Sequence, residues 1–532
     1  MSRAGSDPYT WLFITMRARL LLLLIGLRGI SSQRPTLSLD EITTTTSPSI
    51  SYSIPANNLT PLSLTFALCS LSSGTSPPRI SITNTGNEDS QPNTNHDSQV
   101  VNFEHGLAAF SSHFMLGGIL TIDNPSGLSL EIGLSSSSPI HQTNPSLPVL
   151  GDTTSSQAIL FSYPVVPFTT KYPFNPTIPS FPNYTFPAAN MSQPPLPQDA
   201  AISNNNVSLV ILPTSSSSSD IPQTGCYLSS QSSAGTLASS SLWARDSSGF
   251  RFQYFISGLS PQTNYTAFLV NSSTSTTRSI SGPIYFTTKS SSFPCTLTHS
   301  LPFCPSITYA IPLDAPPVPP ASLNFSSYTS ENLPSSITSP LLSYFANFTT
   351  VLSTFPCGRE AYSPIVTCTD CELEYRKWLC SISFPRCSEP PPSLSPSWSP
   401  APPDPSATGI PPQQNPLSLQ HPSPPLPALL PLTPPNSHPR NPFFPTTNLS
   451  QSTSTTYAVL PCIEQCYAVD RSCPPFLKFK CPSARSNAGF SYALGYIDKI
   501  GSDGRHAGSK GKGKGRTGEA QDRWGNVWCL ML

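Results

Sequence analysis

A cluster of cysteines in the second half of the chain constrains the fold more than any other feature. Ten of the 14 cysteines lie between positions 304 and 481, and a long stretch rich in proline and serine interrupts them. Clustered thiols form disulfides, bind metal ions or take part in redox chemistry. The members are Cys304, Cys357, Cys368, Cys371, Cys380, Cys387, Cys462, Cys466, Cys473 and Cys481.

Three stretches around these cysteines have the spacing of amphipathic helices. Counted from Cys371, Tyr375 and Trp378 fall on one face of a 3.6-residue period. Residues 341–355 show the same periodicity and end at Pro356, which stops a helix. Sulfurs that face inward on short helices predict a small α-helical domain. In the second cysteine stretch the positions that share a face are Cys462, Cys466, Val469 and Cys473.

The first 32 residues predict a secretory route. An apolar run at residues 20–25 follows two arginines and precedes small residues, which is typical of a signal peptide over residues 1–32. We expect translation to begin at Met16. No later stretch holds 18 apolar residues, so we expect no membrane span.

Asn-X-Ser/Thr sequons predict a secreted glycoprotein, and their asparagines are Asn58, Asn183, Asn190, Asn206, Asn264, Asn271, Asn324, Asn347 and Asn448.

An oxidising secretory lumen favours disulfides for the clustered thiols. The spacings Cys368-x-x-Cys371 and Cys462-x-x-x-Cys466 also suit zinc, and the first suits a redox pair. We expect disulfides, and no metal or cofactor. Ten sulfurs allow five bonds, whose connectivity stays open. Four cysteines lie outside the cluster, and two of the first three could pair with each other: Cys69, Cys226, Cys295 and Cys529.

The N-terminal half is predicted to consist of β-sandwich-type domains. Short apolar runs between turn residues indicate one sandwich-like domain over residues 33–165. Within it, the turn between residues 118–122 and 128–132 predicts a hairpin. Residues 166–204 are rich in proline and are expected to form a linker.

A second sandwich is predicted for residues 205–295. The stretch G-L-S-P-Q-T-N-Y-T-A-F-L-V, residues 258–270, resembles the tyrosine-corner strand of fibronectin type III domains, with Tyr265 at the corner. Residues 296–387 and 456–500 then form the helical cysteine-rich domain. Its fold is expected to depend on disulfides.

Two segments do not fit a packed domain. Residues 388–455 are dominated by proline and serine and are expected to be a disordered insertion within the cysteine-rich domain. Residues 501–532 form a basic, glycine-rich tail, which we interpret as a gene-model artefact from about Gly504. On this interpretation Cys529 is not a native partner of the cluster.

The cysteine-rich blocks resemble a known family. The segments C-T-D-C-E-L-E-Y-R-K-W-L-C at 368–380 and P-C-I-E-Q-C-Y-A-V-D-R-S-C-P-P-F-L-K-F-K-C-P at 461–482 closely resemble the fungal stretch-activated calcium-channel regulatory subunit, the mating-pheromone-induced-death family. P-F-C-P-S-I-T-Y-A-I-P at 302–312 resembles that family's lead-in to its cysteine-rich domain. The domain is also distantly similar to frizzled-type domains.

This resemblance implies a glycosylated regulatory subunit on the extracellular face of the plasma membrane or in the endoplasmic reticulum. The implied partner is a pore-forming subunit of the voltage-gated calcium-channel type, through which the chain would be membrane-associated. The implied function is support of stress- or stretch-activated calcium influx. The expected mechanism is binding, with the cysteine-rich domain docking on the partner.

Other function classes have less support. Lys+Arg and Asp+Glu are 27 each, so net charge gives no case for nucleic acid. The eight histidines are scattered outside any catalytic motif, so we expect no enzyme and no catalytic residues. The alternative function is a secreted cell-wall adhesin or structural glycoprotein, with a wall hydrolase as a weaker candidate.

Five aromatic or apolar residues are candidates for a partner contact: Phe476, Leu477, Phe479, Tyr375 and Trp378. For the last two, the alternative is packing in the core of a small domain, and we favour that interpretation. For the first three, contact and packing both stay open. Glu372 and Arg376 are four residues apart and are expected to form an ion pair on the exposed side of their helix.

Overall fold

The computed structural model describes residues 34–70, 76–84, 98–169, 191–196, 207–214, 221–274, 277–320, 326–355, 362–389, 429–431, 457–483, 488–493 and 529–532. The predicted signal peptide with Met16, and most of the predicted linker, insertion and tail, lie outside these residues. The chain forms two compact units. They comprise residues 1–141 with 275–277, and residues 142–274 with 278–532.

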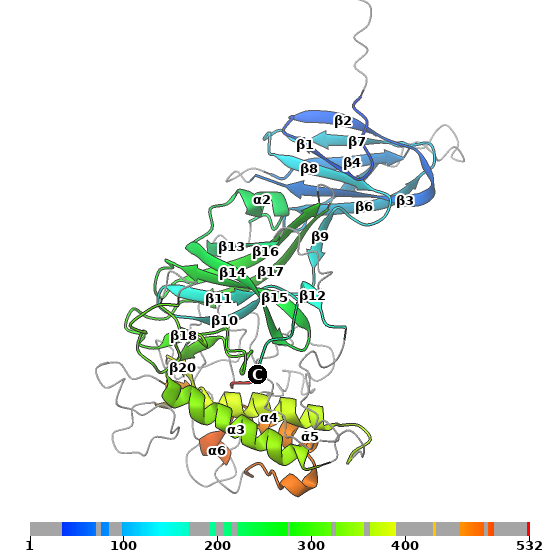
Figure 1. Ribbon diagram of the computed structural model, residues 1–532. Helices are drawn as coiled ribbons and strands as arrows, with labels where there is room; N and C mark the ends of the chain where they lie inside the picture. The colour runs from blue at the N-terminus through cyan, green and yellow to red at the C-terminus, as the bar shows by residue number, and fades with distance from the viewer. Residues whose placement is uncertain are drawn as a thin grey trace, which may run out of the picture. The chain divides into compact units, whose positions relative to one another are not determined.

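The first unit is a sandwich of two antiparallel sheets (Figure 1). One sheet has the order β1 (Glu41–Thr45), β8 (Leu130–Ser135), β3 (Asn57–Leu68) and β6 (Leu107–Phe114). The other has the order β2 (Ser49–Ile54), β7 (Gly118–Asp123), β4 (Arg79–Asn84) and β5 (Ser98–Val101). Leu62, Leu64 and Phe66 alternate along β3 and are fully buried, as expected where one face of a sheet forms the core.

The predicted hairpin between residues 118–122 and 128–132 is wrong. Strand β7 pairs with β2 and β4, whereas β8 pairs with β1 and β3, so the turn between them crosses from one sheet to the other. Buried Asn124 holds this turn by accepting a hydrogen bond from the backbone N–H of Leu128 and donating one to its carbonyl. Turn residues alone cannot distinguish a hairpin from such a crossover, because both need the same local chain reversal.

The second unit contains another pair of sheets and the cysteine-rich region. One sheet runs β10 (Val149–Thr153), β11 (Gln157–Phe161), β15 (Gly249–Ser257) and β12 (Val166–Pro167), and β14 (Thr236–Asp246) also pairs with β15. The other runs β13 (Val207–Pro213), β16 (Asn264–Thr274), β17 (Thr277–Thr287) and β9 (His141–Asn144). A short helix, α2 (Gly225–Ser230), begins after Thr224, whose hydroxyl accepts from the N–H of Tyr227.

The second sandwich begins earlier in the chain than predicted. It includes strands that the prediction assigned to the first domain, residues 33–165, rather than to the second, residues 205–295. Strands β10 and β11 belong to it, because β11 pairs with β15 along its whole length. Tyr265 lies buried in this sandwich, and the backbone N–H of Ser260 donates to its hydroxyl at 2.9 Å. A hydroxyl bonded to backbone a few residues upstream is the geometry of a tyrosine corner.

The cysteine-rich region contains three principal helices, α3 (Ser335–Ser353), α4 (Cys368–Ser383) and α5 (Ile463–Ser472) (Figure 1). Helix α3 begins six residues before the predicted start at 341 and holds Pro340 inside it. The buried face already includes Ile337, one turn before Leu341, although Pro340 removes one backbone hydrogen bond. The short elements are β18 (Thr296–Thr298), β19 (Tyr309–Ile311), β20 (Arg386–Ser388), β21 (Leu429–Pro431), β22 (Tyr457–Val459), η4 (Pro475–Leu477) and α6 (Ala488–Ser491).

Part of the predicted disordered insertion is ordered. Residues 429–431 form β21, which pairs antiparallel with β22. Two leucines supply the apolar character of a strand within an otherwise proline-rich stretch. None of the helices in the part of the chain that the structure describes is long and apolar enough to cross a membrane.

Candidate functional site

Helix α4 is the centre of the candidate site. Thr367 caps its N-terminus, because its hydroxyl accepts from the N–H of Asp370 while the Asp370 carboxylate accepts from the N–H of Thr367. Cys371 is fully buried on one face of the helix, where Tyr375 and Trp378 are partly buried beside it. Cys380, nine residues further on and therefore on the opposite side, is buried as well. The predicted periodicity is therefore confirmed for α4.

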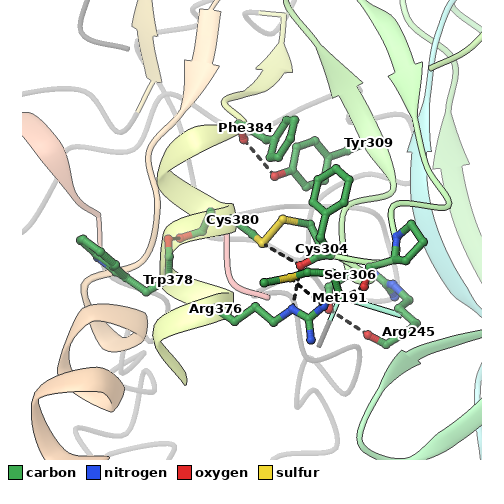
Figure 2. Close-up of a disulfide and its surroundings, with 12 residues drawn as sticks. Met191, Arg245, Cys304, Ser306, Tyr309, Arg376, Trp378, Cys380 and Phe384 are labelled. Atoms are coloured by element: carbon green, nitrogen blue, oxygen red, sulfur yellow. Dashed lines mark hydrogen bonds between the residues drawn. A yellow bond between two sulfur atoms is a disulfide. The ribbon is translucent and has the colours of Figure 1, made fainter. Parts of the chain in front are cut away.

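Five disulfides whose two members are identified join segments of the chain, four of them across 67 residues or more. Cys371 on α4 is bonded to Cys473 at the end of α5, so these two helices are fixed side by side. Cys304 is bonded to Cys380, which fixes the other end of α4 (Figure 2). Such bonds act mainly by restricting the unfolded chain. The other pairs are Cys295–Cys387, Cys462–Cys529 and Cys466–Cys481.

The bonding pattern extends beyond the ten predicted framework cysteines. Cys295 and Cys529 each bond a member of the cluster. The structure therefore does not confine five bonds to those ten cysteines. The expectation that Cys529 has no native partner is contradicted. Backbone hydrogen bonds from Leu530 N to Leu460 O and from Cys462 N to Leu530 O place it beside Cys462. Cys368, Cys69 and Cys226 are also disulfide-bonded, and Cys357 lies outside the described residues.

Arg376 is buried, so its predicted position on the exposed side of the helix is wrong. Its Nε donates to the carbonyl of Phe303 at 2.7 Å, and its Nη2 donates to the carbonyl of Pro302 at 2.9 Å (Figure 2). Burial lowers the pKa of Arg376 to about 10, and the nearby Glu372 acts in the opposite direction. Arg376 therefore remains charged at neutral pH and ties α4 to the backbone beside Cys304.

Most of the five candidate contact residues lie in an aromatic core. The Tyr375 ring stacks on Phe348 of α3, with ring centroids 3.5 Å apart, and Trp378 meets Phe479 edge-on at 4.9 Å. The indole N–H of Trp378 also donates to the hydroxyl of Tyr492 at 2.9 Å.

The remaining candidates differ in exposure. Leu477 packs into the same aromatic core, whereas Phe476 is 45% exposed. Phe476 is thus the one exposed residue among the five predicted contacts.

A buried ion pair joins the second sandwich to the cysteine-rich helices. Arg386, just after α4, contacts the carboxylate of Asp152 on β10 at 3.1 Å and donates to the carbonyl of Gly151. The N–H of Ala310 donates to the same carboxylate. Sequence analysis missed this pair, because 234 residues separate its members. The adjacent bond from Cys387 to Cys295 makes the connection covalent as well.

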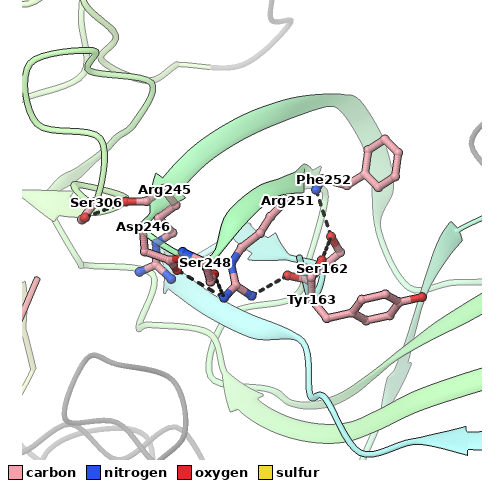
Figure 3. Close-up of polar contacts among 8 residues, drawn as sticks. All are labelled: Ser162, Tyr163, Arg245, Asp246, Ser248, Arg251, Phe252 and Ser306. Atoms are coloured by element: carbon pink, nitrogen blue, oxygen red, sulfur yellow. Dashed lines mark hydrogen bonds and ion pairs between the residues drawn. The ribbon is translucent and has the colours of Figure 1, made fainter. Parts of the chain in front are cut away.

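The hairpin of β14 and β15 makes a second connection to the cysteine-rich region. Arg251 contacts Asp246 and donates to the carbonyl of Ser162 (Figure 3). Ser306 donates to the carbonyl of Arg245 at 2.8 Å, and the indole of Trp243 donates to the carbonyl of Pro305. Both contacts hold the segment that follows Cys304.

The buried histidines serve as hydrogen-bonding groups inside the two units. His299 contacts the hydroxyls of Ser300 and Ser327, and its burial lowers its pKa to about 3. His141 contacts Glu131 at 3.3 Å and Thr65 at 2.9 Å within the first sandwich. A Thr-His-Glu arrangement of this kind resembles an activated nucleophile, but Thr65 is almost completely buried. It has no access to a substrate in this conformation.

The sequons differ in accessibility. Asn58 and Asn347 are exposed, whereas Asn264 and Asn271 are half-buried and their side-chain amides contact Thr287 and Tyr163. The other predicted sequons, Asn183, Asn190, Asn206, Asn324 and Asn448, lie outside the described residues.

Comparison with known proteins decides the family. The profile of the family described as stretch-activated Ca²⁺-permeable channel component matches residues 62–504. The chain belongs to this family. The match covers most of the first sandwich, the second sandwich and the cysteine-rich region up to residue 504.

Three curated relatives are similar to the chain. A stretch-activated cation channel of Cryptococcus neoformans is 32% identical over 75% of this chain and 62% of its own length. Those of Saccharomyces cerevisiae and Schizosaccharomyces pombe are 26% and 33% identical, over 43% and 26% of this chain and 35% and 27% of their own. The chain thus spans less than two thirds of these relatives. All three are named as channels, and none as an enzyme.

One solved structure, a purple acid phosphatase from yellow lupin seeds, is 11% identical over 58% of this chain and 48% of its own. Its TM-score of 0.15 is too low to indicate a shared fold.

Proposed function

We propose that this chain is an extracytoplasmic regulatory subunit of a fungal plasma-membrane calcium channel. It binds a pore-forming subunit of the voltage-gated type and supports stress- or stretch-activated calcium influx. The chain reaches its partner as a secreted glycoprotein, after removal of its signal peptide. The family match over residues 62–504 is the observation that carries the proposal.

The cysteine-rich region suits the role of a docking body. Helices α4 and α5 are joined covalently, and Arg376 ties α4 to the segment before Cys304. A body that is already rigid loses little conformational entropy when it binds, so more of the contact energy contributes to affinity. The buried pair between Arg386 and Asp152 would carry the same rigidity into the second sandwich.

Calcium uptake in a strain that lacks the gene tests this proposal. We expect uptake induced by mating pheromone or stress to fall in the deletion strain and to return with the full chain. The Cys371→Ala variant should fail to restore uptake, because it breaks the bond between α4 and α5. Ser343→Ala, at an exposed position of α3, is the matched control and should restore it.

Co-purification separates a channel subunit from the alternative of a wall adhesin. The tagged full chain should retain a large membrane protein of the voltage-gated channel type. Unchanged calcium uptake in the deletion strain, together with retention of the chain in the cell wall, would contradict the proposal.

A further inference from the structure

Helix α3 has an outer face that carries no charge. None of its 19 residues is acidic or basic, whereas the solvent face of a surface helix normally carries charged side chains. This face exposes two large side chains with apolar surface, Tyr344 at 51% and Val351 at 47%. Exposed Asn347 lies between them and begins the sequon Asn347-Phe348-Thr349.

We propose that the first N-acetylglucosamine of a glycan on Asn347 packs on the ring of Tyr344. The inference rests on the proposed function, because a chain receives this glycan in the secretory pathway. It gives the sugar a structural role, which is to cover apolar surface of α3 that would otherwise face water.

The helix brings the three side chains together. Tyr344 precedes Asn347 by three residues and Val351 follows it by four. Residues at these spacings are neighbours on a helix surface, with Cβ atoms about 5–6 Å apart. Side chains of a helix lean toward its N-terminus, so the Asn347 amide leans over the turn that carries Tyr344. A sugar attached to that amide therefore starts beside the Tyr344 ring.

Packed residues hold the attachment point in place. Phe348 stacks on Tyr375 of α4, with ring centroids 3.5 Å apart, and Thr349 is only 3% exposed. The last two residues of the sequon therefore face the interior of the domain, while Asn347 faces solvent. Because the root of the glycan is fixed in this way, its first sugar loses little further entropy when it contacts the ring.

The chemistry of the sugar complements that of the tyrosine ring. One face of a pyranose presents mainly C–H groups, and the negative face of an aromatic ring attracts them. The contact also removes apolar surface of both rings from water. The hydroxyl and acetamido groups stay at the rim of the sugar, where they bind water. The glycan thus gives this part of α3 the hydrophilic surface that charged side chains usually provide.

Melting temperatures of the full secreted chain test the inference through a double-mutant cycle. Asn347→Gln removes the glycan, and Tyr344→Ser removes the ring. We expect the loss caused by Asn347→Gln to be about 2 °C larger in the wild type than in the Tyr344→Ser background. Gln favours a helix more than Asn does, but this gain is the same in both backgrounds and cancels.

Two further backgrounds separate the ring from other changes to α3. Tyr344→Phe keeps the ring face, so the loss caused by Asn347→Gln should equal that in the wild type. Leu342→Ser is the matched control, since Leu342 is also exposed on α3 but does not share the spacing of three or four residues with Asn347. The loss in this background should likewise equal that in the wild type.

Trimming with endoglycosidase H tests whether the first sugar is the one that matters. The enzyme leaves a single N-acetylglucosamine on each occupied asparagine. We expect the difference in melting temperature between the wild type and Asn347→Gln to persist after trimming, because only the first sugar contacts the Tyr344 ring. This measurement does not depend on the folding of the Tyr344→Ser chain.

Equal losses from Asn347→Gln in the wild type and in Tyr344→Ser would overturn the inference, as would a loss that disappears after trimming. An unchanged gel mobility of Asn347→Gln would also overturn it, because no sugar would then be attached at this position. None of these results bears on the role in calcium influx, which uptake by the deletion strain tests separately.

Discussion

Arg386 and Asp152 form a buried ion pair at 3.1 Å although 234 residues separate them in the sequence. Asp152 lies on β10 of the second sandwich, and Arg386 follows helix α4. The carboxylate also accepts from the N–H of Ala310, so one acidic side chain serves three segments of the unit. The sandwich and the helices are thereby packed as one body.

Arg386→Met should destabilise this body strongly. Removal of one partner leaves the Asp152 carboxylate buried without its counter-ion, which costs about 3–5 kcal/mol. We expect the midpoint of urea unfolding to fall accordingly. The double variant Asp152→Leu/Arg386→Met should recover much of the loss, because it removes both members of the pair and buried Lys289 keeps Glu389 as an acidic neighbour. Equal midpoints for the single and double variants would contradict this account.

Cys371→Ser should lower the free energy of unfolding by about 2–5 kcal/mol and reduce secretion. The reason is that the bond to Cys473 is the covalent link between α4 and α5. Cys371→Ser/Cys473→Ser should cost about as much as either single change, since all three lack the same bond. Secretion assays and urea unfolding of the secreted chain measure both effects. Wild-type stability in the double variant is the result that would refute the prediction.

His299 should make stability depend on pH below neutrality. Burial lowers its pKa from 6.5 in the unfolded chain to about 3 in the folded chain. Between these values the unfolded state binds the extra proton, so stability is unaffected above pH 6.5 and falls as the pH drops toward 3. The contribution approaches about 1.4 kcal/mol per pH unit in that window.

Urea unfolding at several pH values measures this effect, and other acids are controlled for by comparison with His299→Gln. The variant removes the titrating ring, so its stability should vary less steeply with pH than that of the wild type. The comparison uses the slope of the free energy of unfolding against pH, and not the overall loss of stability in the variant. Equal slopes for the wild type and His299→Gln would exclude His299 as the cause of the pH dependence.

The described sequons should differ in glycan occupancy. Asn58 and Asn347 are exposed, so Asn58→Gln and Asn347→Gln should each remove one glycan, visible as a mobility shift on gels. Asn271 donates from its amide nitrogen to the Tyr163 hydroxyl, and that nitrogen is the atom to which a glycan is attached. Asn271→Gln should therefore leave mobility unchanged. A shift for Asn271→Gln equal to that for Asn347→Gln would contradict the structural argument.

Local periodicity predicted the helices of the cysteine-rich region. The spacing of Cys371, Tyr375 and Trp378 predicts one packed face of α4, because every 3.6 residues return to the same side of a helix. It does not predict that Cys380, on the opposite side, is buried too. The Tyr265 corner was also predictable, since its partner Ser260 is only five residues away. Alternation of apolar residues likewise indicated sandwiches.

Long-range pairing could not be predicted from those patterns. The turn at Asn124 reads the same whether β7 and β8 pair with each other or lie in different sheets. The assignment of β10 and β11 to the second sandwich depends on β15, about 90 residues downstream in the register from Phe161 to Gln253. Disulfide connectivity could not be predicted for the same reason, because residue spacing does not specify which distant thiols meet. The buried position of Arg376 depends on carbonyls some 73 residues away.

The pairing of β20 with β22 has a practical consequence for the stretch between them. Ser388 lies opposite Tyr457 of β22, and β21 pairs with the other edge of β22, so Ser388 and Leu429, which flank residues 390–428, belong to one three-stranded sheet. The distance between these two points is set by the sheet and does not depend on the number of residues that connect them. A fluorescent protein or protease site placed between residues 390 and 428 would therefore report on the living cell without altering the geometry of the body that carries it.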